Sequence, residues 1–335
     1  MRIAVDVMGS DNFPVPDIEG AILAAREYGE MLVLVGDESV IKAELSKHDI
    51  AGLPLEIVHA AEVVTMTDKP SVVGKAKPNS SIHVGTRLVK DGQADAFVSV
   101  GNTGAILAIS MLQTLKRIPG VKRPALSGVI NVDGKLVTMI DVGANPDSRP
   151  EWMLQYAIMG DIYSRRVIGT SNPTIGLLSN GEEEGKGNSQ IHETAELLRH
   201  TKLNFVGNVE PKEVLEGAVD VMVADGFVGN IFIKSLEGFG SYLFKSVRRE
   251  VSADIPSKLG GLLARPALRR VYKRVDPFEI GGAPLLGVNG VVIIGHGRTN
   301  ALGMKNAIRQ AKQAVQGKII DAIQSSFQSE AAIEE

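Results

Sequence analysis

The stretch at 223–230, VADGFVGN, places one carboxylate, two glycines and one amide side chain directly after an apolar run. These residues are Asp225, Gly226, Gly229 and Asn230. Glycine lets backbone N–H groups approach a ligand closely, and a helix start offers unpaired donors at the positive end of the helix dipole. Where a strand ends and a helix begins, such a set is suited to holding an anion.

Similar polar stretches follow most of the other predicted strands. They are DVMGSDN with Asp6 and Gly9, GNTGA with Gly101, Asn102, Thr103 and Gly104, DVGAN with Asn145, EGKGN with Lys186 and Asn188, GNVE at 207, and GHGRTN with His296. Ligands bind outside the carboxyl ends of strands in open parallel sheets, so we expect these stretches to share one edge. One such turn alone indicates only a capped helix. Several at one edge predict a phosphate and substrate site.

Motifs for other chemistries are absent or incomplete. GEEEGKGN is one residue short of a P-loop and has glycine where Ser or Thr would meet magnesium, and GHGRTN lacks the third glycine of a dinucleotide fingerprint. No GxSxG elbow occurs, and the chain has no cysteine to act as a thiolate or zinc ligand. We therefore expect no metal site and no cofactor. The remaining donors and Lys186 can hold an oxyanion without the enzyme supplying a nucleophile.

The elements that position these stretches alternate along the chain. Short β-branched runs such as RIAVD, MLVLVGD and AFVSVG are each followed by a segment of helical periodicity, which predicts a mostly parallel sheet with helices on both faces. We expect one large α/β body over residues 1–335, with a crossover near 120–150 and a helical hairpin inserted at 227–278. ALGMKNAIRQAKQAVQGKIIDAIQSSF at 301–327 predicts a terminal amphipathic helix.

Composition restricts the class of protein. The 335 residues carry a formal net charge of −3, which argues against a general nucleic-acid surface. The N-terminus reaches an aspartate at position 6, unlike a signal peptide, and no apolar run approaches the roughly 18 residues that span a bilayer. We expect a cytoplasmic protein with peripheral membrane contact.

A set of motifs spread over almost the whole chain resembles the bacterial phosphate acyltransferases, the PlsX family. In order, the motifs are VDVMGSDNFP, VSVGNTGA, DVGAN, LQYAIMG, EGKGN, NFVGNVE, VADGFVGN, GGAPLLG and AIRQA. The resemblance implies transfer of a long-chain fatty acyl group from acyl carrier protein to inorganic phosphate, for phospholipid synthesis. It also implies a three-layer α/β/α sandwich like that of isopropylmalate dehydrogenase. A homodimer, no redox cofactor, and a membrane glycerol-3-phosphate acyltransferase that receives the product are further implied.

Roles for individual residues follow from that resemblance as hypotheses. Phosphate itself attacks the thioester, held by the GNTGA turn and neighbouring loops, while Lys186 neutralises it and stabilises the tetrahedral oxyanion. Asn230 donates to the thioester oxygen or orients phosphate. Asp225 ties down its loop and fixes Lys186 or Asn230, while Gly226 and Gly229 let the backbone close in.

Residues 254–278 are basic, whereas the chain as a whole is acidic. The segment contains six cations and two aspartates, a net charge of +4. Pro256 and Pro266 are expected to divide it into short helices. Apolar residues at a bend flanked by cations suit an anionic membrane or the acidic carrier protein. The expected contact residues are Leu259, Leu262, Leu263, Arg265, Arg269 and Arg270. A dimer-packing hairpin is the alternative.

Three other functions fit parts of the pattern. A phosphotransacetylase using acyl coenzyme A has similar fold and phosphate chemistry. A nicotinamide-dependent decarboxylating dehydrogenase of similar architecture needs clustered aspartates for a metal, whereas the aspartates here are scattered. A non-enzymatic membrane scaffold would leave the polar strand ends without a purpose.

Overall fold

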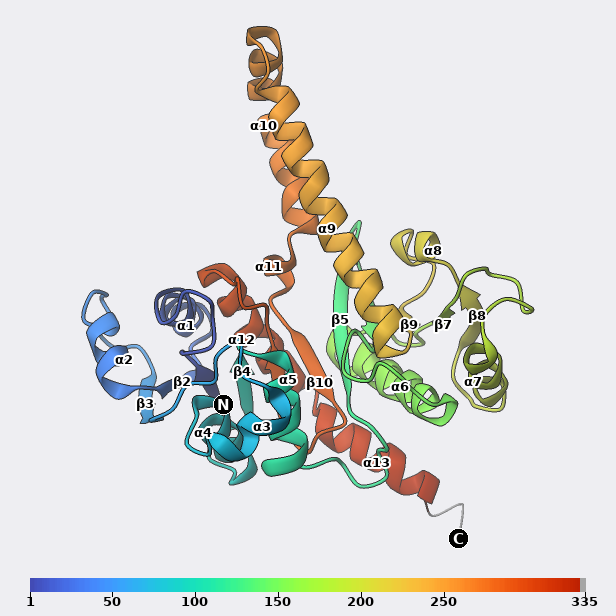
Figure 1. The fold of residues 1–335 in the computed structure, drawn as a ribbon, viewed down its shortest axis with the longest axis horizontal. Helices are drawn as coiled ribbons and strands as arrows, with labels where there is room; N and C mark the ends of the chain where they lie inside the picture. The colour runs from blue at the N-terminus through green and yellow to red at the C-terminus, as the bar shows by residue number, and fades with distance from the viewer. Residues whose placement is uncertain (332–335) are drawn as a thin grey trace.

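The computed structural model describes residues 1–331 and contains one 11-stranded sheet, shown in Figure 1. In spatial order, the strands are β3 (Leu55–His59), β2 (Met31–Gly36), β1 (Arg2–Asp6), β4 (Ala96–Ser99), β11 (Val291–Ile294), β10 (Ala283–Leu286), β5 (Ala125–Val132), β6 (Lys135–Ile140), β9 (Val221–Val223), β7 (Ile175–Leu178) and β8 (Phe205–Val209). Most neighbours are parallel, as expected.

Helices cover both faces of the sheet. They are α1 (Val15–Tyr28), α2 (Glu38–Leu45), α3 (Pro70–Ala76), α4 (Ser81–Lys90), α5 (Thr103–Ala108), the π-helical turn η1 (Ile109–Gln113), α6 (Pro150–Tyr163), the π-helical turn η2 (Ser164–Ile168), α7 (Ser189–Arg199), α8 (Pro211–Leu215), α9 (Gly226–Val251), α10 (Ile255–Val275), α11 (Pro277–Ile280), α12 (Ala301–Gln316) and α13 (Ile319–Ala331). Along β2, Leu32 and Leu34 join one core cluster while Val33 and Val35 join the other. This alternation is typical of a strand covered on both faces, so the predicted three-layer α/β/α class is confirmed.

The direction of the strands reverses in the middle of the sheet. β11 is parallel to β4, but β10 is antiparallel to both β11 and β5, and β5 is antiparallel to β6. The β5–β6 reversal is a tight hairpin in which Asp133 and Gly134 have φ of 48° and 98°, as a two-residue turn requires. The prediction that all polar stretches share one edge is therefore wrong. One group follows β1, β4 and β11, and the other follows β6, β7, β8 and β9.

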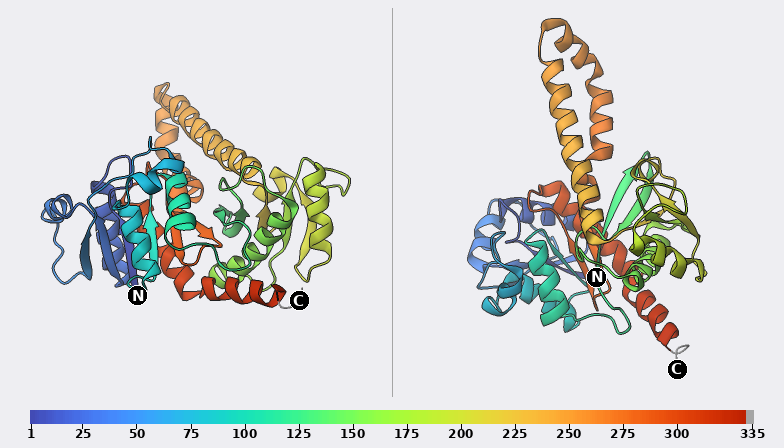
Figure 2. Two further views of the ribbon diagram at one scale, coloured as in Figure 1. Left: turned by 60° about the horizontal axis from the view of Figure 1, so that its bottom comes forward. Right: turned by 45° about the vertical axis from the view of Figure 1, so that its right-hand side comes forward.

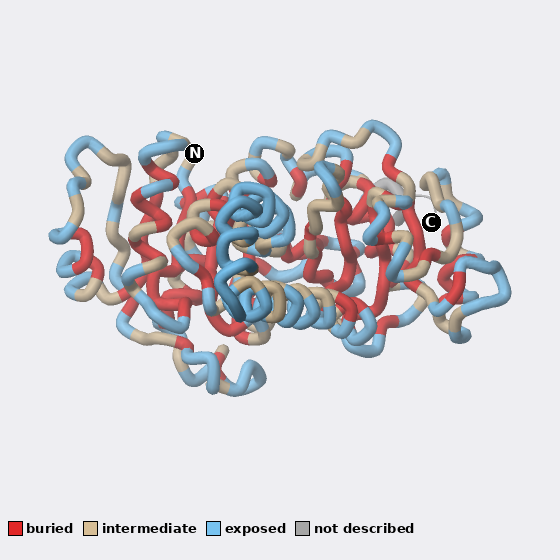
Figure 3. The backbone as a smooth tube through the Cα atoms, turned by 90° about the horizontal axis from the view of Figure 1, so that it is seen from above, coloured by how far each residue is buried: buried red, intermediate tan, exposed pale blue. Residues whose placement is uncertain are grey.

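Helices α9 and α10 form a hairpin that protrudes from the sheet, which Figures 1 and 2 show from three directions. Only Gly226, Gly229 and Phe232, at the base of α9, are buried, and α10 has no buried residue. Figure 3 colours the chain by burial: much of the sheet is red, which marks buried residues, and most of the hairpin is pale blue, which marks exposed ones.

Helix α10 is continuous, which corrects the expectation that prolines divide it. Pro256 lies in its first turn, where a missing N–H costs nothing, and Pro266 lies inside the helix. Helix α9 lies alongside α10 and stabilises it, with the rings of Phe244 and Tyr272 packed edge to face at 5.1 Å. Among the residues that the structure describes, no helix combines the length and apolarity needed to cross a bilayer.

Candidate active site

The first group of polar loops surrounds a buried aspartate at the end of β1. Asp6 accepts hydrogen bonds from Ser99 Oγ (2.7 Å) and from the Met8 N–H (3.0 Å). Burial raises the pKa of Asp6, and both hydrogen bonds oppose that rise. A Cβ on Gly9 would lie 2.8 Å from the Gly101 nitrogen. Asp6 and Gly9 therefore join the loops after β1 and β4, and neither is available to a ligand directly.

Asn102 begins α5 and holds a neighbouring loop. Its Oδ1 accepts from the Ala105 N–H (3.0 Å), and its Nδ2 donates to the carbonyl oxygens of Thr65, Met66 and Asp68. Thr103 is exposed, and a Cβ on Gly104 would lie 2.6 Å from Pro70 Cγ. The Asn102 side chain, which was predicted to bind phosphate, thus uses both its oxygen and its nitrogen in hydrogen bonds within the protein.

His296 completes the first group from the loop after β11. It is exposed, and its Nδ1 accepts from the Arg298 N–H at 3.1 Å. The Asp11 N–H donates to the Gly297 carbonyl at 2.8 Å, and the Gly295 N–H donates to the Ser99 carbonyl at 2.9 Å. The structure therefore brings DVMGSDN, GNTGA and GHGRTN together.

Two further acids of the described chain lie at these loops without having been predicted. Asp17, in the first turn of α1, accepts from Ser10 Oγ at 2.6 Å, and burial raises its pKa to about 7. Asp141 directly follows β6 and organises DVGAN in the second group of loops, as described next. Asp141 carries a detectable signal, an aspartate directly after a predicted strand, whereas Asp17 reads as an ordinary helix-start residue.

The second group is organised around Asp141. Its carboxylate accepts five hydrogen bonds, from the backbone N–H groups of Leu126, Gly143, Ala144 and Asn145 and from Asn145 Nδ2. Burial raises the pKa of Asp141, and the hydrogen bonds act in the opposite direction. Asn145 Nδ2 also donates to the Pro124 carbonyl at 2.8 Å. Asn145 is therefore a structural partner of Asp141.

The start of α9 packs directly on this loop. Asp225 is the N-cap, and its Oδ1 accepts from the N–H groups of Phe227 (2.9 Å) and Val228 (3.0 Å). A Cβ on Gly226 would lie 2.7 Å from the Asn145 oxygen, and one on Gly229 would lie 1.9 Å from the Asp141 oxygen. The two glycines thus let backbone approach backbone. Asp225 makes no direct hydrogen bond to Lys186 or Asn230 among the described residues; its carboxylate caps α9, the helix that carries Asn230.

The first turn of α9 has no N–H left for an anion. Phe227 and Val228 donate to the Asp225 side chain, Gly226 donates to the Asn145 carbonyl at 2.8 Å, and Gly229 donates to the Asp225 carbonyl at 2.9 Å. An anion beside this helix must therefore be held by side chains.

Lys186 and Asn230 are side-chain donors of the second group that remain unengaged. Lys186 is exposed and Asn230 is half-buried, and neither side chain forms a hydrogen bond or ion pair within the described part of the chain. Asn230 faces Gly143, whose added Cβ would lie 3.4 Å from Asn230 Oδ1. Free donors of this kind are what an oxyanion requires.

The loop that carries Lys186 is braced by its neighbours. Asn180 Oδ1 accepts from the Gly187 N–H at 3.0 Å, and Asn208 Nδ2 donates to the Lys186 carbonyl at 3.1 Å. Asn188 caps α7 by accepting from the Ile191 N–H at 3.0 Å, so it positions the helix. Gln190 then donates to the Ser148 carbonyl, which joins this loop to DVGAN.

Removing the Asp225 cap gives a direct test of its role. Asp225→Ala is expected to lower the free energy of unfolding by about 1–2 kcal/mol, since two N–H groups lose their acceptor. Asp225→Asn keeps an acceptor oxygen and should stay close to wild type. Urea denaturation of the three proteins provides the measurement, and an equal loss in both variants would show that the charge, and not the cap, matters.

Comparisons with known proteins find relatives that match almost the whole chain. The family model described as "Fatty acid synthesis protein" matches residues 1–322. The phosphate acyltransferase of Pelotomaculum thermopropionicum is 45% identical over 329 residues, covering 98% of this chain and 96% of that protein. That of Trichlorobacter lovleyi is 48% identical over 312 residues, covering 93% and 90%.

Solved structures of more distant proteins share the fold. A phosphotransacetylase from Streptococcus pyogenes superposes with a TM-score of 0.59 at 18% identity, covering 93% of this chain and 94% of that one. The 4-hydroxythreonine-4-phosphate dehydrogenase of Klebsiella pneumoniae gives 0.52 at 16% identity, covering 94% and 99%. The expected dehydrogenase-like α/β sandwich is thereby confirmed.

Proposed function

This chain belongs to the phosphate acyltransferase family, and on that premise we propose that it moves a long-chain fatty acyl group from acyl carrier protein to inorganic phosphate. The enzyme class, an acyltransferase that uses phosphate, follows from the family. The observation that carries the mechanism is the pair of unengaged donors, Lys186 and Asn230, in a chain without a cysteine nucleophile. Phosphate then serves as the nucleophile itself.

In the proposed reaction, a phosphate oxygen attacks the thioester carbonyl carbon. The carbonyl oxygen becomes an oxyanion, the carbon–sulfur bond then breaks, and the electron pair leaves with the carrier thiolate, giving acyl phosphate. Lys186 neutralises phosphate and stabilises the oxyanion, while Asn230 donates to the carbonyl oxygen. Asp225, Gly226, Gly229 and Asn188 position these donors.

We propose that both groups of loops border this site. Five strand steps separate β4 from β9, and neighbouring strands are rotated by about 20–25°, which adds up to roughly 100–125°. This rotation turns two carboxyl edges of opposite strand direction toward one side of the molecule. The loops with Gly101, Thr103 and His296 can thus face the loop with Lys186, with phosphate between them.

The hairpin supports a protein carrier as acyl donor and contact with a membrane. Residues 254–278 carry a net charge of +4, and Leu262 and Leu263 near the far end are 62% and 84% exposed. An acidic carrier and an anionic lipid surface both match this combination.

We infer that residues 227–278 are an insertion in a single α/β body. We also infer that a membrane glycerol-3-phosphate acyltransferase receives the product.

A homodimer is also proposed, with the hairpin as its interface. Phe239 and Tyr242 on α9 are 65% and 66% exposed, and Val271 on α10 is exposed as well. Large side chains exposed together along a protruding helix mark a protein-interaction surface. Sedimentation of the full chain tests this proposal, and a monomer at assay concentration would contradict it.

The function is tested by release of carrier thiol from palmitoyl-carrier protein, with and without phosphate. Phosphate-dependent release, with labelled phosphate recovered in the lipid fraction, is the expected result. Release without phosphate would indicate a thioesterase and contradict the anion site. A strong preference for acetyl coenzyme A as donor would instead favour a phosphotransacetylase, the activity that the Streptococcus pyogenes structure is named for.

Contact of the hairpin end with lipid gives a further prediction. Leu262→Glu with Leu263→Glu should abolish binding to anionic vesicles, because two exposed apolar side chains are replaced by negative charges. The matched control is Val206→Glu with Leu215→Glu, which makes the same change on the α/β body, where the two residues are 52% and 43% exposed. Vesicle sedimentation compares the two, and unchanged binding of the first variant would leave hairpin packing as the explanation.

A further inference from the structure

A cavity of about 640 Å³ lies at the base of the hairpin, between α10, α11, α12, η2 and the β5–β6 hairpin. We propose that this basal pocket binds one long-chain acyl anion, an apolar chain that ends in a phosphate or carboxylate head group. This inference goes beyond the proposed function and does not depend on it. A volume of this size is within the range of small-molecule sites, roughly 300–1,000 Å³.

The residues that line the basal pocket are of two main chemical kinds. The apolar ones are Val129, Leu136, Val167, Ile168 and Ile280. The charged ones are the cations Arg270, Lys273, Arg274 and Arg309 and the acid Glu279. Four cations and one acid leave a net charge of +3 in a pocket that is also lined by apolar side chains. An amphiphilic anion complements both kinds of lining residue.

The cations are available to a ligand. Arg270 forms no hydrogen bond or ion pair among the described residues, and Arg274 meets Asp133 at 3.0 Å in an exposed pair. Lys273 lies 3.7 Å from Glu279, and Arg309 donates to the Glu279 carbonyl at 2.8 Å. The ion pairs of Lys273 and Arg274 contribute little and exchange easily for a phosphate. Arg309 is held by its bond to the Glu279 carbonyl. Lys273 and Arg274 lie in the last turn of α10, where the helix dipole favours cations. Arg270 and Arg309 lie outside that turn, so the dipole does not account for them.

The basal pocket is separate from the second group of loops, which carries Lys186 and Asn230. Leu136 is the second residue of β6, and Asp141 directly follows the last, so about 17 Å of strand lies between them. The pocket is therefore at the opposite end of β6 from DVGAN and α9's first turn.

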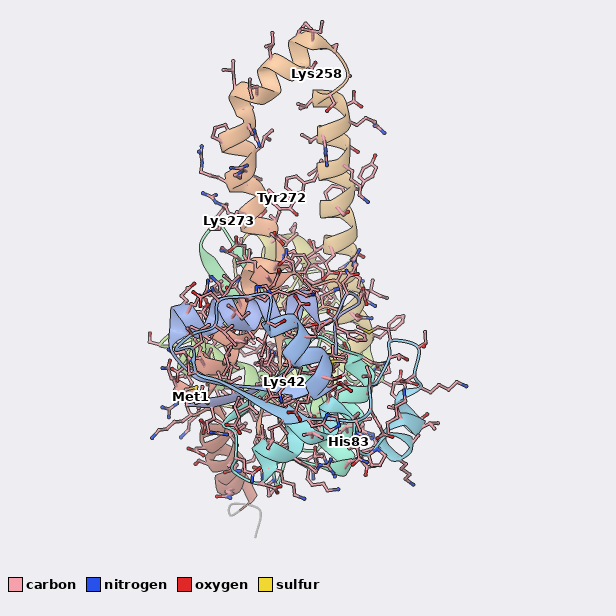
Figure 4. All side chains as sticks on the ribbon, turned by 90° about the vertical axis from the view of Figure 1, so that its left-hand side faces the viewer. Met1, Lys42, His83, Lys258, Tyr272 and Lys273 are labelled. Atoms are coloured by element: carbon pink, nitrogen blue, oxygen red, sulfur yellow. The ribbon has the colours of Figure 1, made fainter. Side chains whose placement is uncertain are left out.

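It is also separate from the end of the hairpin. Figure 4 shows Lys258 at the far end and Lys273 close to the body. Ten residues of helix separate Leu263 from Lys273, which corresponds to about 15 Å. A bilayer touched by the tip does not reach the pocket, so the ligand is a single molecule. Acyl phosphate, the product of the proposed reaction, and free fatty acid share the required chemistry.

Calorimetric titration with tetradecyl phosphate, below its aggregation concentration, tests the inference. This probe cannot transfer an acyl group. Arg270→Ala is expected to weaken binding at least tenfold, since a charge-assisted hydrogen bond to phosphate is lost. Lys258→Ala removes an equal charge from the hairpin outside the pocket and should change nothing. The probe resembles the product of the proposed reaction, so the catalytic loops can bind it as well. Lys186→Ala should weaken only that second binding event and leave unchanged the event that Arg270→Ala weakens.

Three results would overturn the inference. Equal affinity for inorganic phosphate would show that no apolar chain is bound, since each buried methylene strengthens binding by roughly fourfold. Equal weakening by Lys258→Ala and Arg270→Ala would indicate only diffuse charge attraction. Loss of the Arg270-dependent binding event in Lys186→Ala would place that event at the catalytic loops. With those excluded, tighter binding of tetradecyl phosphate than of myristate identifies the phosphate head, and the reverse identifies free fatty acid.

Discussion

Lys186→Ala is expected to lower turnover with palmitoyl-carrier protein by about 10²–10³-fold, the loss typical of one missing oxyanion donor. The Lys186 ammonium is exposed and has no partner in the described chain, so no fold-stabilising contact is removed. Its loop is braced by the backbone through Asn180 and Asn208, which the substitution leaves in place. Activity should therefore fall while the free energy of unfolding stays unchanged.

Lys202→Ala is the matched control for this variant. Lys202 is also exposed, and it lies between α7 and β8, away from the catalytic loops. Steady-state thiol release and urea denaturation are measured on both variants. Near-normal turnover in Lys186→Ala would remove this residue from the mechanism, and a similar loss in Lys202→Ala would indicate a general charge effect on carrier binding.

Gly229→Ala is expected to lower both stability and turnover. The new Cβ would lie 1.9 Å from the Asp141 carbonyl oxygen, so the first turn of α9 must move off the DVGAN loop. Overpacking of this kind costs about 1–3 kcal/mol. Asn230, the next residue, moves with the helix, and a misplacement of about 1 Å lowers turnover by about 10²-fold.

Gly238→Ala on the same helix separates this clash from the substitution itself. A Cβ there meets nothing within 4 Å, and alanine is the better helix former by about 0.5–1 kcal/mol. Gly238→Ala should therefore be as stable as wild type or more stable, with full turnover. If Gly229→Ala behaved in the same way, α9 would not be anchored on Asp141 as the structure shows.

Local patterns in the sequence determine the fold class, the polar loops and the helix boundaries of this protein. The alternation of β-branched runs with helical periodicity predicts the α/β/α class, and the polar strand ends mark the loops that the structure gathers in two groups. The break between α9 and α10 also follows from sequence, because Asp254 caps α10 and Pro256 fits its first turn. Caps, periodicity and turn residues act over a few positions, so the sequence displays them directly.

Which polar residues remain free was decided by the tertiary structure. Asp225, Asn102, Asn145 and Asn188 all look like ligand-binding residues in sequence, yet each is engaged in a cap or a loop. Lys186 and Asn230 differ from them because neither side chain forms a hydrogen bond or ion pair with the described residues. The reversal of strand direction at β5 and β10 likewise assigns the loops to two edges. The caps themselves span two to four residues and are local. The strand reversal, and the bonds from Asn102 Nδ2 to the Thr65 carbonyl and from Asn145 Nδ2 to the Pro124 carbonyl, join segments far apart in sequence, and such contacts leave no local pattern.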